Sequence, residues 1–546
     1  MQSAKALYFT GLLLLITFSL FAGDAYFDLG EEQVYGKSES KVEIEEIGDT
    51  TIPDYIFKTD LYSSTREEAK EKTIENLELI QKRKKKNRAY KSRFSRFLKR
   101  GARAGIGSFG TFWADVEFDI RNKKQDDFHL NLNFFNTDGY RDNNGKTRFG
   151  SGIHWERGKK EKPTINLDAG VILHKKDLPG PTDNIQSDAS VEDAIQNIIL
   201  SYELTKNLAD RLKIKARYEN LDRNIKFSGA KEKQEALLAR LDLQYFTFVR
   251  ERYSVHFGGG ISQDKMQIKG GEDFNADSRQ MYVGVEGTGH DTWGYYLQLR
   301  LAEYKKHGSE LFPSILLNKK LNNKLKLGLE ISRDDAFDKS VRLLTKYEDL
   351  KWSNFSLPIK RRFKILSDYE PSQKTNLSLQ YFYDDYKNYL SFNDIPDNQT
   401  GLTRITLDNI KDATVNGVIT ELEHKLNNFF TFSANLLFQR ADDDNLDSDI
   451  PFVPDMEHTY KLRYKNSSGL TAEAASVYRS SLRTSRGTAS DKISEANLTH
   501  MGLGYQKNEN IHFDFKIKNL YDKYYEIRRK HPGPGREYQL EMKYIY

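Results

Sequence analysis

The chain has 546 residues, a formal net charge of +5 and 30% charged residues, and its mean hydropathy is −0.71. Beyond the N-terminus this composition excludes a helical membrane span, so any contact with lipid must come from strands. No cysteine is present, which excludes disulfides, thiolate metal sites and a lipid-attachment cysteine. Aromatic residues make up 12% of the chain, a content that suits aromatic girdles at two membrane interfaces.

The first 25 residues have the pattern of a cleaved secretory signal. Lys5 precedes the apolar run Leu7–Phe21, and small residues follow at Ala22 and Ala25. An uncleaved anchor is the alternative, but acidic residues follow the short run where a second span would be needed. We therefore expect residues 1–25 to be removed and the mature chain to be exported.

Residues 26–99 are predicted to form a periplasmic or lumenal extension that is strongly polarised in charge. Asp24–Asp60 holds eleven acidic residues against three lysines, whereas Lys82–Arg103 holds twelve basic residues and no acid. Between these blocks, Ser64–Gln81 predicts a helix, because Ser64 and Glu67 stand at capping-box spacing ahead of a thin apolar stripe.

The basic run carries interleaved aromatic residues, a combination that also binds nucleic acid. We expect no nucleic-acid partner, because an exported chain without a recognisable nucleic-acid module is a poor candidate. The run is expected to stay solvated in the periplasm or to fold back against acidic positions of a barrel lumen. Anionic phospholipid or lipopolysaccharide head groups are a third candidate partner. The residues expected to meet in the lumen are Arg93, Arg96, Asp115, Glu117 and Asp119.

Apolar and polar side chains alternate with period two along most of the chain from about residue 100 onward. Each such segment is roughly ten residues long, which is the length of a tilted strand across a bilayer. A large soluble β-protein is the alternative, since its strands show the same alternation. Examples are Ala114–Arg121, Phe128–Phe134, Ile165–Leu173, Leu212–Tyr218, Leu237–Leu243, Ile511–Ile517 and Tyr538–Tyr546. Glycine runs at Gly258–Gly260 and Gly284–Gly289 fall in or beside strands, where they indicate bends and not phosphate cradles.

An ordered series of local motifs accompanies these strands. They are Ser108–Thr111, Asn136–Asn143, Asp177–Pro181, Tyr381–Lys387, Ala413–Glu423, Asn519–Glu526, Pro532–Arg536 and the final strand. From about Arg100 onward the chain resembles the barrel of TonB-dependent receptors, and the C-terminal motifs are the strongest match. The resemblance implies an all-β fold, a transmembrane antiparallel barrel of about 22 strands, over residues 100–546.

Connection lengths agree with this resemblance. If the last strand descends to the periplasm, working backward places long outer loops and short periplasmic turns in alternation. The expected outer loops are Asp522–Gly535, Tyr478–Glu495, Arg440–Pro454, Ser391–Lys411 and Asp334–Asn354, and the expected turns are Gln506–Asn510, Asn466–Gly469 and Lys425–Asn428.

The family's plug domain is the part that the sequence does not match. Receptors of this family carry well over a hundred plug residues ahead of the barrel, whereas only some 75 residues separate the signal from the first strand here. The nearest candidates for a TonB-binding box are Lys41–Glu45 and Asp49–Pro53. A barrel of this size without a plug would hold a wide aqueous channel. Tyr26–Lys99 are expected to act as a reduced plug; a separate plug protein or a tolerated open pore are the alternatives.

No pattern in the sequence predicts an enzyme, a cofactor or a metal site. The histidines are scattered singly, without an HExxH spacing. The acidic run from Asp442 to Asp449 departs from the EF-hand order at Leu446, so a hydrated acidic loop is expected in place of a calcium site. Ligand-binding residues are expected on the outer loops, at Arg141, Asp442, Asp444, Asp447, Arg483, Arg486, Arg528 and Arg529.

These observations predict an outer-membrane transport protein for uptake or passage of a solute, with ligand selection by the outer loops. The alternatives are a surface barrel that acts as an adhesin or receptor anchor, and a wide passive porin. Expected partners are outer-membrane lipid and lipopolysaccharide, the barrel-assembly machinery through the C-terminal strand, an unknown solute, and the TonB system or a separate plug protein. The expected location is the bacterial cell outer membrane.

Overall fold

The structure is a computed structural model that describes part of the chain. The described residues are 101–545 except 122–125, 141–143, 158–163, 179–188, 206–209, 228–229, 250–252, 269–272, 290–292, 337–340, 342–343, 345–349, 353–355, 397–402, 487–491, 509 and 529–530. The predicted signal, the predicted helix at Ser64–Gln81 and the basic run up to Arg100 therefore lie outside the described residues.

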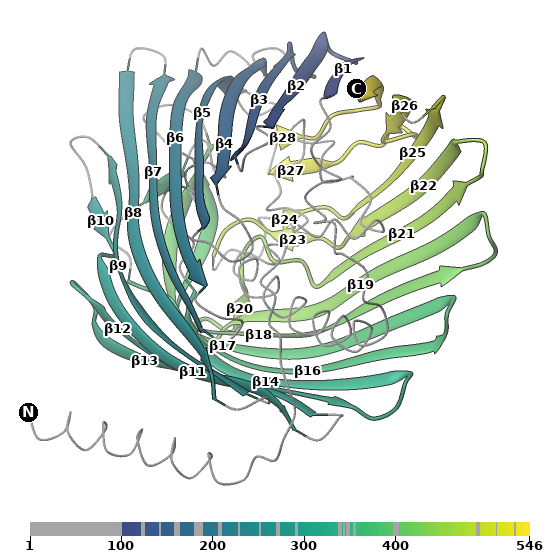
Figure 1. Cartoon of the computed structure of the whole chain (residues 1–546). Helices are drawn as coiled ribbons and strands as arrows, with labels where there is room; N and C mark the ends of the chain where they lie inside the picture. The colour runs from purple at the N-terminus through teal and green to yellow at the C-terminus, as the bar shows by residue number, and fades with distance from the viewer. Residues whose placement is uncertain are drawn as a thin grey trace, which may run out of the picture.

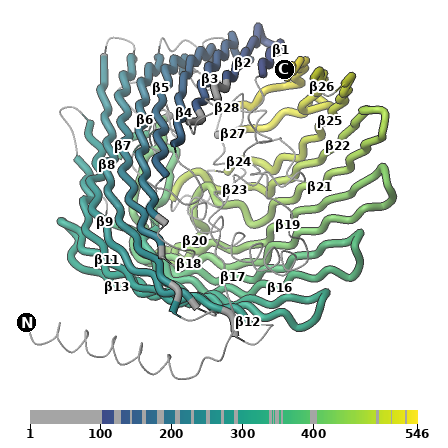
Figure 2. Tube along the Cα trace, in the orientation of Figure 1, coloured from purple at the N-terminus to yellow at the C-terminus, as the bar shows by residue number. Residues whose placement is uncertain are grey.

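The described chain forms a closed antiparallel barrel of 22 wall strands (Figures 1 and 2). The wall strands are β1 Gly101–Gly107, β2 Thr111–Arg121, β3 Asp126–Thr137, β4 Lys146–Arg157, β5 Thr164–Leu178, β6 Ala189–Thr205, β7 Asp210–Phe227, β8 Ala230–Phe248, β9 Tyr253–Ile268, β11 Ser278–Gly289, β12 Trp293–Tyr304, β13 Gly308–Lys320, β14 Leu325–Asp335, β16 Ile359–Ser372, β17 Thr375–Pro396, β18 Thr403–Lys425, β19 Phe430–Asp443, β21 Met456–Lys465, β22 Leu470–Arg479, β25 Ala496–Gln506, β26 Ile511–Lys518 and β29 Glu537–Ile545. No helix among the described residues is long and apolar enough to cross a membrane.

Seven short strands lie in the connections between wall strands. They are β10 Asp273–Asn275, β15 Leu350–Trp352, β20 Ser448–Asp449, β23 Leu482–Arg483, β24 Lys492–Ile493, β27 Glu526–Arg528 and β28 His531–Pro532. In Figure 1 the strands β20, β23, β24, β27 and β28 are drawn inside the outline of the ring, so these connections fold inward over one end of the barrel.

The first and last strands close the ring. Strand β1 pairs antiparallel with both β2 and β29, in a register that places Gly101 opposite Ile545 and Gly107 opposite Gln539. The amide of Ser108 extends the seam by donating to the Tyr538 carbonyl oxygen at 2.9 Å. Closure leaves no strand edge unpaired, which is the arrangement that a strand-built membrane protein needs.

Alternation along each strand sends apolar side chains to the outside of the ring. On β29 these are Tyr538, Leu540, Met542 and Tyr544, all exposed. The same outward, exposed set continues around the wall, for example at Phe118, Leu173, Leu243, Leu301 and Tyr381. The period-two prediction for these segments is confirmed, and the outer surface has the apolar face that a bilayer requires.

The alternation of long and short connections is confirmed for the last strands of the barrel. Short turns join β25 to β26, β21 to β22 and β18 to β19 at the positions expected from the sequence, and long connections join β19 to β21, β22 to β25 and β26 to β29 on the other side. On that same side only three residues join β12 to β13. One expected loop is wrong: most of Ser391–Lys411 is strand, because β17 and β18 continue as a paired ribbon beyond the wall up to Pro396 and Thr403. Long connections mark the outer side of an outer-membrane barrel, so we call that end the outer end.

Candidate functional site

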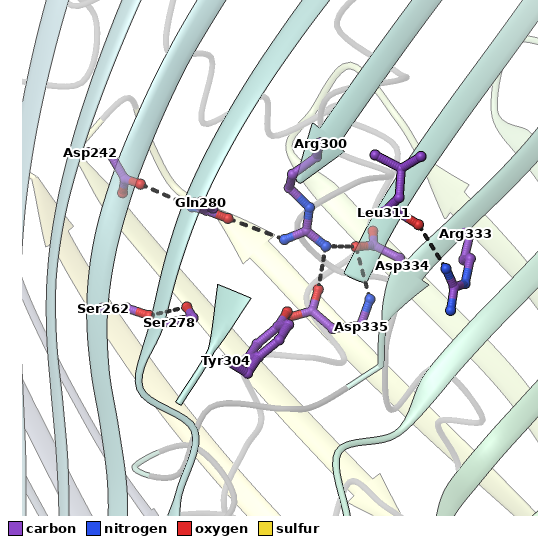
Figure 3. A network of polar contacts seen from close by, with 10 residues as sticks. All are labelled: Asp242, Ser262, Ser278, Gln280, Arg300, Tyr304, Leu311, Arg333, Asp334 and Asp335. Carbon is purple, nitrogen blue, oxygen red and sulfur yellow. Dashed lines mark hydrogen bonds and ion pairs between the residues drawn. The ribbon is translucent and has the colours of Figure 1, made fainter. Parts of the chain in front are cut away.

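A polar network centred on Arg300 lies on the inner face of β11, β12 and β14 (Figure 3). Arg300 donates to the side-chain oxygen of Gln280 at 3.2 Å and to the carboxylates of Asp334 and Asp335, the latter at 2.6 Å. The Tyr304 hydroxyl donates to Asp335 at 2.9 Å. Both sequence neighbours of Arg300 are exposed leucines on the outside of the barrel, so the alternation of the strand directs the guanidinium inward.

Arg333 bridges a break in the ladder between β13 and β14. The pairing of these strands stops beside Pro313, which has no backbone N–H to donate. The guanidinium of Arg333 donates to the Leu311 carbonyl oxygen at 2.9 Å (Figure 3). It also donates to the Glu310 carboxylate at 2.6 Å. The side chain therefore supplies donors where the strand backbone cannot.

Charged side chains are also buried in pairs farther along the inner wall. Arg362 of β16 donates to both oxygens of Asp384 on β17, each at 2.7 Å. Glu330, on the inner face of β14, accepts from Ser332 at 3.2 Å. Buried charges of this kind are tolerated because each one is paired or hydrogen-bonded. A solute that reaches this wall meets a fixed, hydrogen-bonding surface of mixed charge.

Above these charges the inner faces become apolar, and the outer connections cover them. The cluster contains buried residues from β7, β8, β9, β12, β13, β17 and β18 together with residues of four connections. Its members include Leu221, Leu238, Met266, Phe312, Leu344, Leu350, Trp352, Phe392, Leu407, Phe452, Leu482 and Ile493. One continuous apolar layer therefore joins opposite walls at the outer end.

The acidic connection between β19 and β21 is tied to the connection between β22 and β25. Arg486 donates to the buried Asp443 at 2.6 Å, and Arg483 donates to Asp449 at 2.8 Å. Burial raises the pKa of the Asp455 carboxyl at the end of this connection, and the nearby Asp449 adds to the effect. The two predicted arginines thus contact Asp443 and Asp449 of the acidic run, which are not among the predicted ligand-binding residues.

The other predicted residues of this loop make local contacts. Asp442 accepts from Arg440 at 2.9 Å, and Asp444 accepts from Thr414 at 2.9 Å. Asp447 occupies a left-handed turn position, with φ of 47°. Within the part of the chain that the structure describes, no group of three or more His, Asp or Glu side chains is arranged to hold a metal ion.

Several predicted residues lie outside the described residues. These are Arg93, Arg96, Arg141 and Arg529, together with the side chains of Asp119 and Arg528. Asp115 does face the Arg103 side chain of β1, at 2.5 Å, and Glu117 is exposed in β2. Their expected contact with Arg93 and Arg96, and ligand binding by the outer-loop residues, stay predictions.

The inner-wall residues were missed from the sequence, although a signal for some of them was present. On β8 the predicted apolar face is Leu237–Leu243 at odd positions, yet Ala236 and Leu238 at even positions are also apolar, and both are buried inside. Two apolar faces on one strand indicate that something covers the second face. The partners of Arg300 on other strands leave no such signal, because 34 residues separate it from Asp334.

The strand-built ring and its covered outer end can now be compared with known proteins. Residues 359–520 match the sequence profile of the family described as "TonB dependent receptor-like, beta-barrel". Over these residues the chain is similar to the barrel of TonB-dependent receptors. The resemblance inferred from the motifs is thereby confirmed over this part of the barrel, and the predicted location in the bacterial outer membrane agrees with it.

Solved structures share the fold of this TonB-dependent-receptor-like barrel. The ferric-catecholate import receptor Fiu from E. coli K12, in its closed form, has a TM-score of 0.66 at 13% identity, with 82% of each chain covered. The copper transporter OprC has a TM-score of 0.67 at 12% identity, over 82% of this chain and 80% of that chain. The ferric yersiniabactin uptake receptor FyuA from Yersinia pestis has a TM-score of 0.65 at 11% identity, over 82% and 80%. Comparison with curated protein sequences gives no match.

Proposed function

We propose that this barrel takes up a solute across the outer membrane and that its outer connections select the solute. The observation that carries the proposal is the covered outer end: a closed ring whose connections pack into one apolar layer above a polar inner wall. A barrel that served only as an anchor would have no use for a covered, hydrogen-bonding lumen. The similar structures include a ferric-catecholate import receptor, a ferric yersiniabactin uptake receptor and a copper transporter, which gives a starting panel of solutes.

The proposal assigns solute contact to the inner wall around Arg300. Its guanidinium is fixed by Asp334 and Asp335 and points into the lumen, so it offers a preorganised donor to an oxygen-rich solute. The untested outer-loop residues, above all Arg483 and Arg486, would form the first contact on the outer side. Energised uptake with the TonB system fits the family, whereas the solute itself does not follow from the fold.

Uptake of radiolabelled ferric catecholate, ferric yersiniabactin and copper by cells that carry or lack the gene tests the proposal. We expect saturable uptake of at least one probe that stops when the proton-motive force is collapsed. In the Arg300→Met variant we expect the half-saturation concentration to rise at least tenfold at an unchanged amount of barrel in the membrane. Arg361→Met is the matched control, because the Arg361 side chain lies on β16 and faces the outside of the barrel.

Two results would replace the proposal with another. Uptake that rises linearly with concentration and ignores the proton-motive force would indicate a wide passive porin. A deletion strain that loses adhesion to a surface or to a phage, with no change in the flux of any probe, would indicate an anchor.

A further inference from the structure

A row of cations follows the inner face of β7. We call its members, Arg211, Lys213, Lys215 and Arg217, the basic row. They face inward because the intervening residues of the strand, such as the exposed Tyr218, face the outside. Successive members lie two residues apart, about 6.8 Å along the strand. Since β7 begins at Asp210 on the periplasmic side, the basic row extends from that rim toward the middle of the barrel, and all four side chains are partly exposed.

Lys215 lies among other cations. The charges of Lys213, Arg217 and Arg240 act on it, and Asp242 of β8 is the acid opposite it in the register. Asp242 already accepts a hydrogen bond from Arg240 at 2.6 Å, so its single charge is shared. Arg217 and Arg240 are direct cross-strand partners, and like charges in such positions destabilise a sheet. An arrangement that costs stability indicates a role other than folding.

Two further acids lie beside the basic row. Arg217 donates to Glu219 on its own strand at 2.8 Å, and the register places Glu203 of β6 opposite Lys213. With Asp242, these give three acids against the five cations of the basic row and Arg240. The periplasmic half of this wall therefore has an excess of positive charge.

A continuous polar surface connects the basic row with Arg300 (Figure 3). Gln280 of β11 accepts from Arg300 at 3.2 Å and donates to Asp242 at 3.4 Å. Asp242 reaches across β9 because that strand has a glycine there: a Cβ at Gly260 would lie 2.5 Å from the Asp242 Oδ1 atom. The guanidinium that is proposed to contact the solute is thereby joined to the side chains that lead to the periplasmic side.

We propose that the solute is an extended anion, a chain with several carboxylate or phosphate groups, and that the basic row binds it lengthwise between Arg300 and the periplasm. The inference rests on the proposed function, because it names the chemical class of the solute. A compact anion contacts one or two members of the basic row, whereas a chain contacts all of them. Lysine and arginine bind both carboxylate and phosphate oxygens, so the basic row accepts either group. Several weak contacts in line hold a solute and still release it.

The chain itself contains one competing anion. The segment Asp24–Asp60 holds eleven acidic residues, whereas the basic run Lys82–Arg103 is repelled by the basic row. The connection to Arg300 favours a solute that moves along the wall, because a docked segment needs no such connection.

Binding to the full-length protein in detergent, measured by isothermal titration calorimetry, tests the proposal. The probes are hexagalacturonate and linear hexaphosphate, with maltohexaose as a neutral chain and citrate as a compact anion. We expect at least one charged chain to bind, more weakly as salt is raised, and to bind at least tenfold more tightly than citrate. Binding of maltohexaose or citrate as tight as that of the charged chains, or no binding of either charged chain, overturns the proposal.

Paired substitutions locate the binding on the wall. Lys213→Gln with Lys215→Gln should raise the dissociation constant of the bound chain at least tenfold, and Lys213→Arg with Lys215→Arg should retain binding because the charges stay. The matched control is Lys231→Gln with Lys233→Gln, which removes the same charge from the outside of β8. It should change the dissociation constant less than twofold. Equal weakening in the control, or loss of binding in the arginine variant, contradicts the assignment to the basic row.

Two observations separate this inference from its alternatives. If Lys213→Gln with Lys215→Gln makes the segment Asp24–Asp60 more sensitive to endoproteinase Glu-C, the basic row holds the chain's own acidic segment and the proposal is overturned. Saturable uptake of ferric catecholate or copper by a barrel that binds neither charged chain keeps the proposed function and removes this inference. Binding of a charged chain without saturable uptake of any solute contradicts the proposed function alone.

Discussion

The pairs Arg362–Asp384 and Arg361–Asp385 allow burial to be tested separately from charge. Both join β16 to β17 at adjacent positions, but the first faces inward and the second faces outward. The inner pair has two hydrogen bonds of 2.7 Å, and its side chains are 12% and 3% exposed. The outer pair is 3.6 Å apart, and its side chains are 58% and 36% exposed.

We expect Asp384→Asn to destabilise the barrel strongly and Asp385→Asn to have little effect. Removing one partner of a buried pair leaves the other charge without compensation, which costs about 3–5 kcal/mol. An exposed pair contributes about 0–1 kcal/mol, because water solvates the separated charges. The two variants should therefore differ by roughly 3 kcal/mol, or about a hundredfold in the unfolding equilibrium constant.

Equilibrium unfolding by guanidinium in detergent micelles, followed by tryptophan fluorescence, measures both variants. The double variant Asp384→Asn with Arg362→Met should recover part of the lost free energy of unfolding, since it also removes the unpaired charge of Arg362. If both single variants lower the free energy of unfolding by the same amount, within about 0.5 kcal/mol, the reasoning from burial is refuted.

Three other perturbations give independent tests. Arg486→Gln removes the ion-pair partner of the fully buried Asp443, so proteinase K should cut the connection between β19 and β21 in intact cells. The Arg440 side chain is 72% exposed, so Arg440→Gln should leave this connection resistant. Gly469→Ala should lower the thermal stability of the barrel more than Gly308→Ala does. Both glycines have positive φ, but a Cβ at Gly469 would lie 2.3 Å from the Gln506 carbonyl oxygen, whereas one at Gly308 meets open space. Thermal unfolding on gels compares the two variants, and equal losses of stability would contradict the contact argument. Deleting residues 26–99 should raise conductance in planar bilayers if they act as the reduced plug that the basic run suggests, and unchanged conductance would defeat that prediction.

The wall of the barrel could be predicted from the sequence because a membrane-facing strand obeys a simple rule. One face must be apolar for about ten residues, so Leu540, Met542 and Tyr544 and their counterparts on other strands reveal strand, phase and outward face together. The order of short turns and long connections then fixes which end is which. These features depend only on residues near each other in the chain.

The covered outer end could not be predicted in the same way, because it depends on contacts across the ring. Glu232 and Arg404 are 172 residues apart, and nothing near either one in the sequence indicates a partner. The sequence predicts a loop for the ribbon of β17 and β18 beyond the wall, because its apolar residues, such as Leu390 and Phe392, do not alternate against lipid. They face the apolar layer at the outer end, which local alternation cannot predict.

Apolar residues thus serve different purposes on the outside of the wall and in the apolar layer at the outer end. The belt on the wall contacts lipid and has no reason to change. The apolar layer at the outer end joins the outer connections to opposite walls, and buried polar contacts such as Arg404 with Glu232 fix its arrangement. An apolar layer alone would tolerate many packings, whereas a buried bidentate pair favours one, because any other arrangement leaves its charges unpaired.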